Sequence, residues 1–284
     1  MSAPWRPRLT AGRALLSAFV HKIPMLIHPD PDDPNCADIM VDAAIGGRPY
    51  RLRLDTGAAR TQLVADEYLA GLPAQGRNTS AGAFGQPEDA DLIRLSGLTI
   101  GELTLPPLDV VRVDAPGQQH LLGMDVLRDH RCEFRFDRDL LVLDGLPAPR
   151  ADLELQLDDR GHVYVTLSWG AVAASGCWDS GAGITVADRA FRLRHPELFT
   201  DAGRAAGTDS TGAQFTTPTF TLAGPRIAGI EFPPSKVAVI DMSPINRELE
   251  FPLDLIIGYP LLRQANWLFD FPARRWAAPE PIGR

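Results

Sequence analysis

Two short stretches of the sequence place an aspartate before a hydroxyl residue and a glycine, LDTGA at 54–58 and CWDSGAG at 177–183. Either stretch alone is ordinary turn chemistry and says little about function. Two carboxyl groups held close together can do more. They share one proton, so that one acts as a base while the other acts as an acid. The chemistry therefore depends on whether the fold brings Asp55 and Asp179 together.

The chain repeats itself around these two aspartates, and the repeat indicates how they are positioned. Each copy reads as strand, turn, strand, the acid-hydroxyl-glycine group, a further strand and then Val-Ala-Asp. Three pairs of segments align in the same order: 38–69 with 162–191, 92–113 with 220–240, and 120–143 with 254–278. Asp55 and Asp179 occupy matching places, so two motifs that are weak singly give a strong joint signal.

The elements that must position the aspartates are mostly strands. Short alternating or β-branched runs, separated by Gly, Pro and Asp, predict an all-β protein with few helices. The short helices are expected at 64–70, 123–130, 187–193 and 259–265. The turn-rich stretch 144–152 separates the two copies. The predicted organisation is an N-terminal extension at 1–36, a first lobe at 37–148 and a second lobe at 149–284.

These motifs resemble those of the aspartic proteases, over about residues 37–280. Retroviral enzymes of this family bring one Asp-Thr-Gly from each of two subunits, whereas pepsin-like enzymes carry both motifs in one chain. Here one chain holds both, in short halves with Ala58 and Ala182 after the glycines, so it resembles a fused retropepsin dimer. The resemblance implies a bilobed pepsin-like fold made of two tandem retropepsin-like β-barrel halves with short helices.

The resemblance also implies a role for each motif residue in an aspartic endopeptidase. Asp55 and Asp179 would be the catalytic pair, and water would attack the peptide bond directly, without a covalent intermediate. The residues implied to support the catalytic loops are Thr56, Gly57, Ser180, Gly181, Gly123 and Gly258. The candidate flap residues, in the small polar stretches 80–86 and 209–215, are Gly82, Phe84, Gly85 and Gly212.

The sequence departs from the family pattern in two ways. Retroviral enzymes usually have an acid after the Ala and an Arg after the later Gly, a pair that stabilises their dimer. Ala59, Gly183, Met124 and Tyr259 stand at those places here. Covalently joined halves can tolerate this loss, so we expect a monomer. The second departure is that Ala58 and Ala182 cannot donate the hydrogen bond that favours the ionised acid in pepsin-like enzymes. We therefore expect a mildly acidic to neutral working range.

Composition excludes several other classes of protein. With 36 acidic and 28 basic residues, the net charge of −8 argues against a nucleic-acid partner. No segment approaches the roughly 20 apolar residues of a membrane helix. The six histidines lack the spacing of a metal site, and no phosphate-binding loop is present, so neither a metal nor a cofactor is expected. The expected partner is a peptide or protein substrate.

Three cysteines without a paired spacing argue against a disulfide framework and favour the cytoplasm. Export remains the alternative if the short apolar run at 14–20 acts as a signal. Three other interpretations of the chain stay open. It could be a catalytically silent peptide-binding or scaffolding protein of the same fold. The aspartates could be turn residues of a duplicated β-barrel. Residues 1–36 could be a cleavable or autoinhibitory segment.

Overall fold

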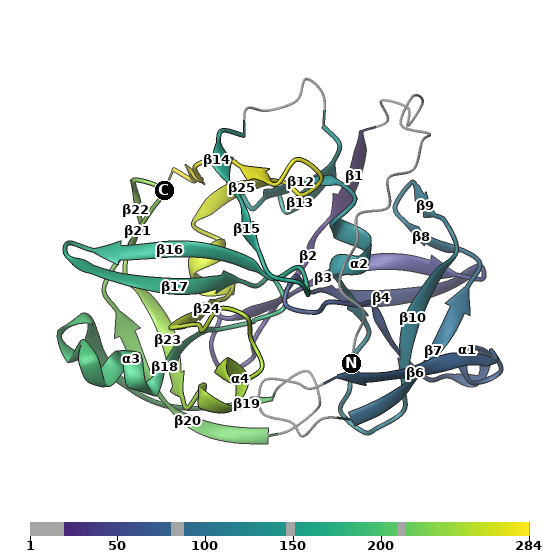
Figure 1. The fold of residues 1–284 in the computed structure, drawn as a ribbon, viewed down its shortest axis with the longest axis horizontal. Coiled ribbons are helices and arrows are strands. Elements are labelled where there is room, and N and C mark those ends of the chain that lie inside the picture. Colours follow the sequence, from purple (N-terminus) through teal and green to yellow (C-terminus); the bar gives the residue numbers. More distant parts are fainter. Residues whose placement is uncertain (1–19, 81–87, 146–150, 209–213, 284) are drawn as a thin grey trace.

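Short alternating runs of apolar residues form strands through most of the chain, which confirms the prediction of a mainly β protein. The structure is a computed structural model that describes residues 20–80, 88–145, 151–208 and 214–283. Its strands form three sheets, two with ten strands and one with seven. Figure 1 shows one ten-stranded sheet on each side and the seven-stranded sheet above and between them.

The two ten-stranded sheets have the same strand order, so the repeat in the sequence is a repeat of the fold. The first sheet runs β6 (Ala74–Ser80), β7 (Glu88–Leu95), β10 (Leu108–Val113), β5 (Gln62–Val64), β11 (Leu121–Leu122), β4 (Arg48–Leu54), β3 (Ala37–Ile45), β8 (Leu98–Ile100), β9 (Leu103–Leu105), with β2 (Leu26–Pro29) on β3. The second sheet runs β19 (Phe199–Thr208), β20 (Gln214–Leu222), β23 (Ser235–Ile240), β18 (Thr185–Asp188), β24 (Leu255–Ile257), β17 (Val172–Trp178), β16 (Val163–Trp169), β21 (Arg226–Ile227), β22 (Ile230–Glu231), with β15 (Gln156–Leu157) on β16.

The seven-stranded sheet, which we call the joining sheet, takes strands from both copies of the repeat. Its order is β1 (His21–Pro24), β13 (Leu140–Leu143), β12 (Arg131–Arg135), β25 (Ala265–Asp270), β26 (Arg275–Trp276) and β14 (Leu153–Glu154), with β27 (Glu280–Pro281) on β25. The central pair, β12 and β25, is antiparallel and links the end of the first copy to the end of the second. This pairing fixes how the two copies face each other.

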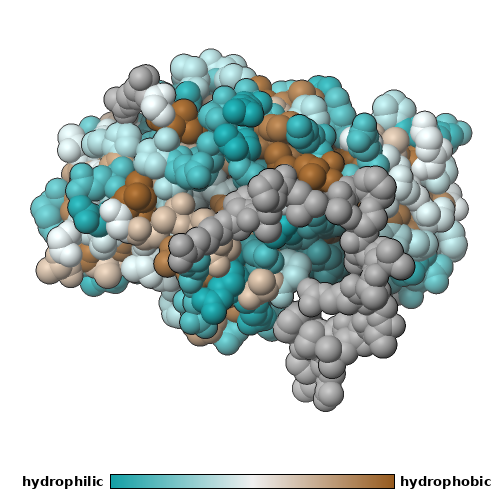
Figure 2. All heavy atoms as spheres, turned by 90° about the horizontal axis from the view of Figure 1, so that it is seen from above, coloured by the Kyte–Doolittle hydropathy of each residue, from teal (hydrophilic) through white to brown (hydrophobic). Residues whose placement is uncertain are grey.

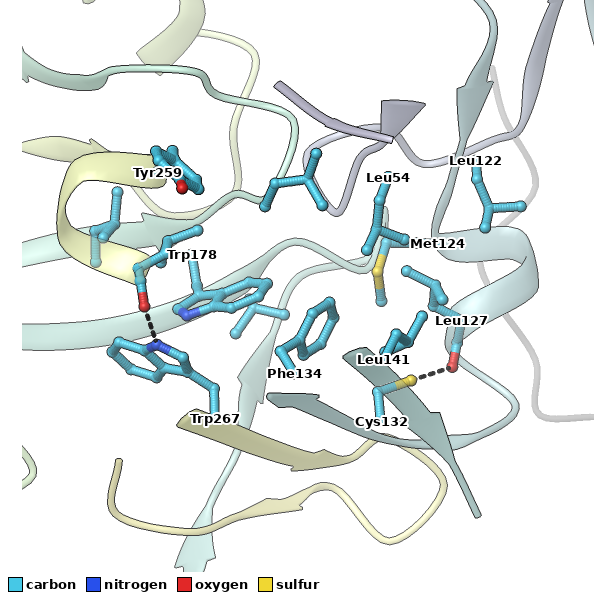
Figure 3. Packing of buried hydrophobic residues seen from close by; sticks show 14 of the residues in the cluster. Leu54, Leu122, Met124, Leu127, Cys132, Phe134, Leu141, Trp178, Tyr259 and Trp267 are labelled. Atoms are coloured by element: carbon cyan, nitrogen blue, oxygen red, sulfur yellow. Dashed lines mark hydrogen bonds between the residues drawn. The ribbon is translucent and has the colours of Figure 1, made fainter. Parts of the chain in front are cut away.

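Aromatic and aliphatic side chains pack together against the joining sheet (Figure 3). Phe134 of β12 lies 4.6 Å from Trp178 and 6.2 Å from Phe269, measured between ring centroids. Trp178 is fully buried, and so is Leu54, its counterpart at the end of β4. Each of these two residues immediately precedes a motif aspartate, so the core anchors both aspartate-bearing loops from behind.

The helices in the described residues are at most six residues long, shorter than the sequence pattern predicts. They are α1 (Glu67–Ala70), α2 (Met124–Leu127), α3 (Arg189–Arg194), α4 (Ser243–Asn246), α5 (Tyr259–Leu262) and the 3-10 helix η1 (Pro196–Leu198). The helix expected at 64–70 begins only at Glu67, because Asp66 caps it by accepting a hydrogen bond from the Leu69 N–H at 2.7 Å. Neither α4 nor η1 was expected from the sequence pattern.

The start of the described chain belongs to the sheets, which differs from the separate extension expected at 1–36. Strand β1 pairs with β13 and buries Ile23, while β2 pairs with β3. Prolines at 24 and 29 hide the alternation in the sequence, but both strands are edge strands, where proline is tolerated. Farther on, Asp33 forms an ion pair with Lys236 of the second sheet at 2.6 Å.

The three cysteines are free and buried, as a chain without a disulfide framework requires. In the described parts of the chain, no helix has both the length and the apolar character needed to cross a membrane. Figure 2 shows the molecule from above, with hydrophilic side chains over most of that face and apolar side chains in patches between them.

Candidate active site

Each motif aspartate follows the last residue of an inner strand and is held there by a parallel neighbour. The Asp55 N–H donates to the Leu122 carbonyl at 3.0 Å, and the Asp179 N–H donates to the Ile257 carbonyl at 3.0 Å. The neighbours are β11 beside β4 and β24 beside β17. Because these pairings match, the two loops are presented in the same way from opposite sides.

The hydroxyl residues tie the two loops together. The Thr56 hydroxyl donates to the Trp178 carbonyl at 3.0 Å and accepts from the Ser180 N–H at 3.0 Å. In the opposite direction, the Ser180 hydroxyl donates to the Leu54 carbonyl at 2.8 Å and accepts from the Thr56 N–H at 3.2 Å. Both hydroxyl groups are buried, so these four bonds form where water cannot replace them. Side-chain hydrogen bonds therefore hold the two loops together in both directions.

The motif glycines allow each loop to touch the opposite aspartate. A Cβ atom at Gly57 would lie 2.6 Å from the Asp179 carboxyl oxygen Oδ2, and one at Gly181 would overlap the Asp55 carboxyl group. Both contacts are too short for any side chain. The Gly57 N–H donates to Asp179 Oδ1 at 3.1 Å, and the Gly181 N–H donates to the same oxygen at 2.8 Å. The fold therefore brings both carboxyl groups to one place, where the two loops meet.

The later glycines of each copy support the loops from behind. The residues after Gly123 and Gly258 donate backbone hydrogen bonds to the Ala58 and Ala182 carbonyls, at 2.8 and 2.9 Å. A Cβ atom at Gly123 would lie 2.5 Å from the backbone of Arg60, and the Gly258 position is equally closed by the backbone of 182–184. These positions can only be glycine if the loops keep this geometry.

Two threonines that the sequence analysis did not single out complete this support. The Thr61 hydroxyl accepts from the Gly123 N–H at 3.2 Å, and the Thr185 hydroxyl accepts from the Gly258 N–H at 3.1 Å. Both threonines are fully buried. The sequence feature that could have identified them is a threonine shortly before Val-Ala-Asp in both copies.

The environments of the two carboxyl groups differ. Asp55 is only 7% exposed, and burial, followed by the charge of Asp179, raises the pKa of Asp55 to about 7. Asp179 is partly exposed, and burial raises its pKa too, but the Gly181 and Gly57 N–H groups and nearby positive charge oppose the shift. Burial and like-charge repulsion together favour a state in which the pair shares one proton.

Two ion pairs next to the loops were not predicted. Arg53 pairs with Asp38 at 2.6 Å and donates to the Gly181 carbonyl at 3.3 Å. His162 pairs with Asp158 at 2.7 Å and contacts the Gly57 carbonyl at 3.0 Å. Asp38 and His162 occupy the same place in the repeat but differ in charge, so the alignment gave no sign of a shared role.

Gly183 stands where retroviral enzymes usually carry an acid, and residues at the start of β3 pack against it. The Ala37 N–H donates to the Gly183 carbonyl at 3.2 Å, and a Cβ atom at Gly183 would lie 3.2 Å from an Asp38 carboxyl oxygen. The start of β3 therefore closes this position. The expected flap residues Gly82, Phe84, Gly85 and Gly212 lie outside the described residues.

The described part of the chain contains no group of three His, Cys, Asp or Glu side chains placed to hold a metal ion. What the site offers chemically is a pair of carboxyl groups with one proton between them, in contact with backbone N–H donors.

Comparison with known proteins gives one family match. Residues 41–129 match the model of the family described as gag-polyprotein putative aspartyl protease. The match includes Asp55, Thr56, Gly57 and Gly123, so it covers the site residues of the first copy. A search of curated proteins finds no match. The match does not extend to the second copy, which shares with the first its sequence repeat and the strand order of its sheet.

Proposed function

We propose that this chain, whose residues 41–129 form a retropepsin-like aspartyl protease domain, is an aspartic endopeptidase with a single active site. Asp55 and Asp179 are its catalytic pair. Residues 37–148 and 149–284 act as two lobes that bind an extended peptide or protein substrate between them. The observation that carries the proposal is the contact of each motif glycine with the opposite aspartate, which leaves both carboxyl groups facing the same small volume.

The two carboxyl groups divide the work of peptide hydrolysis. Asp179, whose Oδ1 accepts two N–H bonds, is the charged member and removes a proton from the attacking water. Asp55 is the protonated member and donates a hydrogen bond to the substrate carbonyl as negative charge develops on its oxygen. Water adds to the carbonyl carbon, and the tetrahedral intermediate then loses the amine, which takes a proton from the pair. No covalent bond to the protein forms.

A pKa of about 7 for Asp55 supports a mildly acidic to neutral working range. The pair is active while it holds one proton, so activity falls above the pH at which Asp55 loses that proton. Ala58 and Ala182 contribute by withholding the side-chain donor that would stabilise the charged form. One chain supplies both motifs, which supports a monomer as the working unit.

Cleavage of a peptide library tests the proposal. The wild-type chain should cleave internal peptide bonds near pH 5–7, and Asp55→Asn and Asp179→Asn should each lower kcat/KM by at least about 1,000-fold. Asp129→Asn is the matched control, because Asp129 is an exposed aspartate outside the site. A statine-type inhibitor should block the wild-type reaction. Peptide binding without any cleavage would instead identify a silent binding protein of the same fold.

A further inference from the structure

A buried ion pair stands directly behind the first aspartate-bearing loop and has no part in the mechanism above. Asp158 and His162 lie in the turn between β15 and β16, with side chains 1% and 14% exposed. His162 Nδ1 lies 2.7 Å from Asp158 Oδ2, and His162 Nε2 lies 3.0 Å from the Gly57 carbonyl oxygen. The imidazole therefore bridges the second copy of the repeat to the first.

The partners of the imidazole fix its protonation. The Gly57 carbonyl can only accept a hydrogen bond, so Nε2 carries a hydrogen. Asp158 accepts from the Arg160 and His162 N–H groups at 3.0 and 2.8 Å, which stabilises an ionised carboxylate. An ionised carboxylate also accepts only, so Nδ1 carries a hydrogen as well. His162 is then an imidazolium with both nitrogens donating.

A second cation bridges the copies in the reverse direction. Arg53, in the first sheet, donates to the Gly181 carbonyl and is held by Asp38. Each motif glycine thus has its carbonyl capped by a cation from the other copy. The arginine keeps its charge at every working pH, whereas the histidine does not. One of the two caps is therefore sensitive to pH.

The charged groups that act on His162 are Asp158 and Asp179. Tyr164 lies next to Asp158, and Cys177 lies within the electrostatic reach of both carboxylates. The Tyr164 hydroxyl donates to the Phe251 carbonyl at 3.1 Å and lies 3.4 Å from Asp158 Oδ2, and burial raises its pKa, so it stays neutral. The Cys177 pKa is raised by burial as well. The charges that matter to His162 are therefore the two carboxylates, Asp158 and Asp179.

We propose that His162, held as an imidazolium by Asp158, is a positioning residue that fixes the Gly57 end of the first loop and keeps Asp179 the charged member of the pair. The effect of His162 on catalysis rests on the proposed function, whereas the protonation of His162 and its contact with Gly57 do not. It places Asp158 and His162 in a chain of contacts that runs through Gly57, whose N–H donates to Asp179.

The pKa shifts of His162, Asp158 and Asp179 agree with this role. Burial alone would lower the pKa of His162, but the hydrogen bond and charge of Asp158, the Gly57 carbonyl and the charge of Asp179 together raise it. Burial alone would raise the pKa of Asp158, and His162 overcomes this and lowers it. In return, the charge on His162 lowers the pKa of Asp179, and this favours ionisation of that partner.

The test measures the protons directly by NMR on the full chain. In wild-type protein at pH 6.5, both ring nitrogens of His162 should give imidazolium 15N shifts with attached protons. Carboxyl 13C titration should then show the lower apparent pKa of the Asp55–Asp179 pair rising by about one unit in His162→Gln, which keeps a donor but loses the charge. The acid limb of kcat/KM should move by the same amount.

His130→Gln is the matched control, because His130 Nδ1 makes an equivalent 2.7 Å contact with Asp144 away from the aspartate pair. It should leave the titration of the pair unchanged. A neutral His162 ring in the wild-type protein overturns the proposal without any variant, and so does an unshifted pair in folded His162→Gln. If the NMR results agree but no peptide is cleaved, the proposed protease function fails while the role of His162 in the site stands.

Discussion

At the scale of single residues, two aspartates that look alike in the sequence have different properties in the structure. Asp55 is buried, while Asp179 is partly exposed and accepts two backbone N–H groups at one oxygen. Burial and the neighbouring carboxylate raise the pKa of Asp55 to about 7. The folded protein therefore keeps a proton on Asp55 that the unfolded chain releases near pH 4.

This difference predicts a pH-dependent gain in stability for Asp55→Asn. A raised folded-state pKa costs stability once the pH exceeds the unfolded value, and the cost grows until the folded pKa near 7 is reached. The variant should match wild type at pH 4 and exceed it by roughly 1–3 kcal/mol at pH 8. Urea unfolding at both pH values measures this, with Asp129→Asn as the control. Equal differences at the two pH values would refute the assigned shift.

The residue scale also shows what a sequence can reveal. Asp55, Asp179 and their hydroxyl and glycine neighbours could be predicted, because the repeat presents the same types at the same places twice. His162 and Arg53 could not, because each acts on the other copy through a contact between residues more than 100 positions apart. Only the folded chain brings such partners together.

At the scale of elements, the two aspartate-bearing loops are locked by four cross hydrogen bonds from two hydroxyl groups. The strands behind them, β4 with β11 and β17 with β24, present the loops in register. The strands and their approximate places follow from hydrophobic alternation. The helix lengths do not follow from this alternation. Apolar residues of neighbouring strands, such as those of β5, also fit the helical spacing, so the pattern predicts helices that are too long.

Thr56→Val tests this lock. The substitution keeps the shape of the side chain but leaves the Trp178 carbonyl and the Ser180 N–H without a partner in a buried place. We expect a loss of about 2–4 kcal/mol in the free energy of unfolding and at least a tenfold fall in kcat/KM. Thr99→Val, at an exposed hydroxyl, should change stability by less than about 0.5 kcal/mol. An equally mild effect at Thr56 would mean that the loops hold their positions without the hydroxyl.

At the scale of the whole molecule, the joining sheet determines how the two copies meet. Strand β12 from the first copy pairs with β25 from the second, and Phe134 packs against Trp178 and Phe269, which also contact each other. The strand composition of this sheet could not be derived from the sequence, because its strands come from both ends of the chain and both copies. The proline in β1 further concealed the place of this strand.

Phe134→Ala should weaken both the fold and the site. Removing a fully buried ring leaves a cavity between the copies, at a cost of about 3–5 kcal/mol in urea unfolding. Looser docking of the copies should also lower kcat/KM under conditions where the variant remains folded. Leu153→Ala, on an exposed edge strand of the same sheet, should cost less than about 1 kcal/mol. Similar losses for the two variants would show that the ring has no special place in the interface.

The central claim is that Asp55 and Asp179 of one chain act as a single catalytic pair. The most direct measurement is kcat/KM for the wild-type chain, for Asp55→Asn, for Asp179→Asn and for an equimolar mixture of the two variants. We predict activity in the wild-type chain alone, with no recovery in the mixture, because no chain in it holds both carboxyl groups. Activity regained on mixing would mean that the site forms between chains. Activity close to wild type in either variant would contradict the shared pair itself.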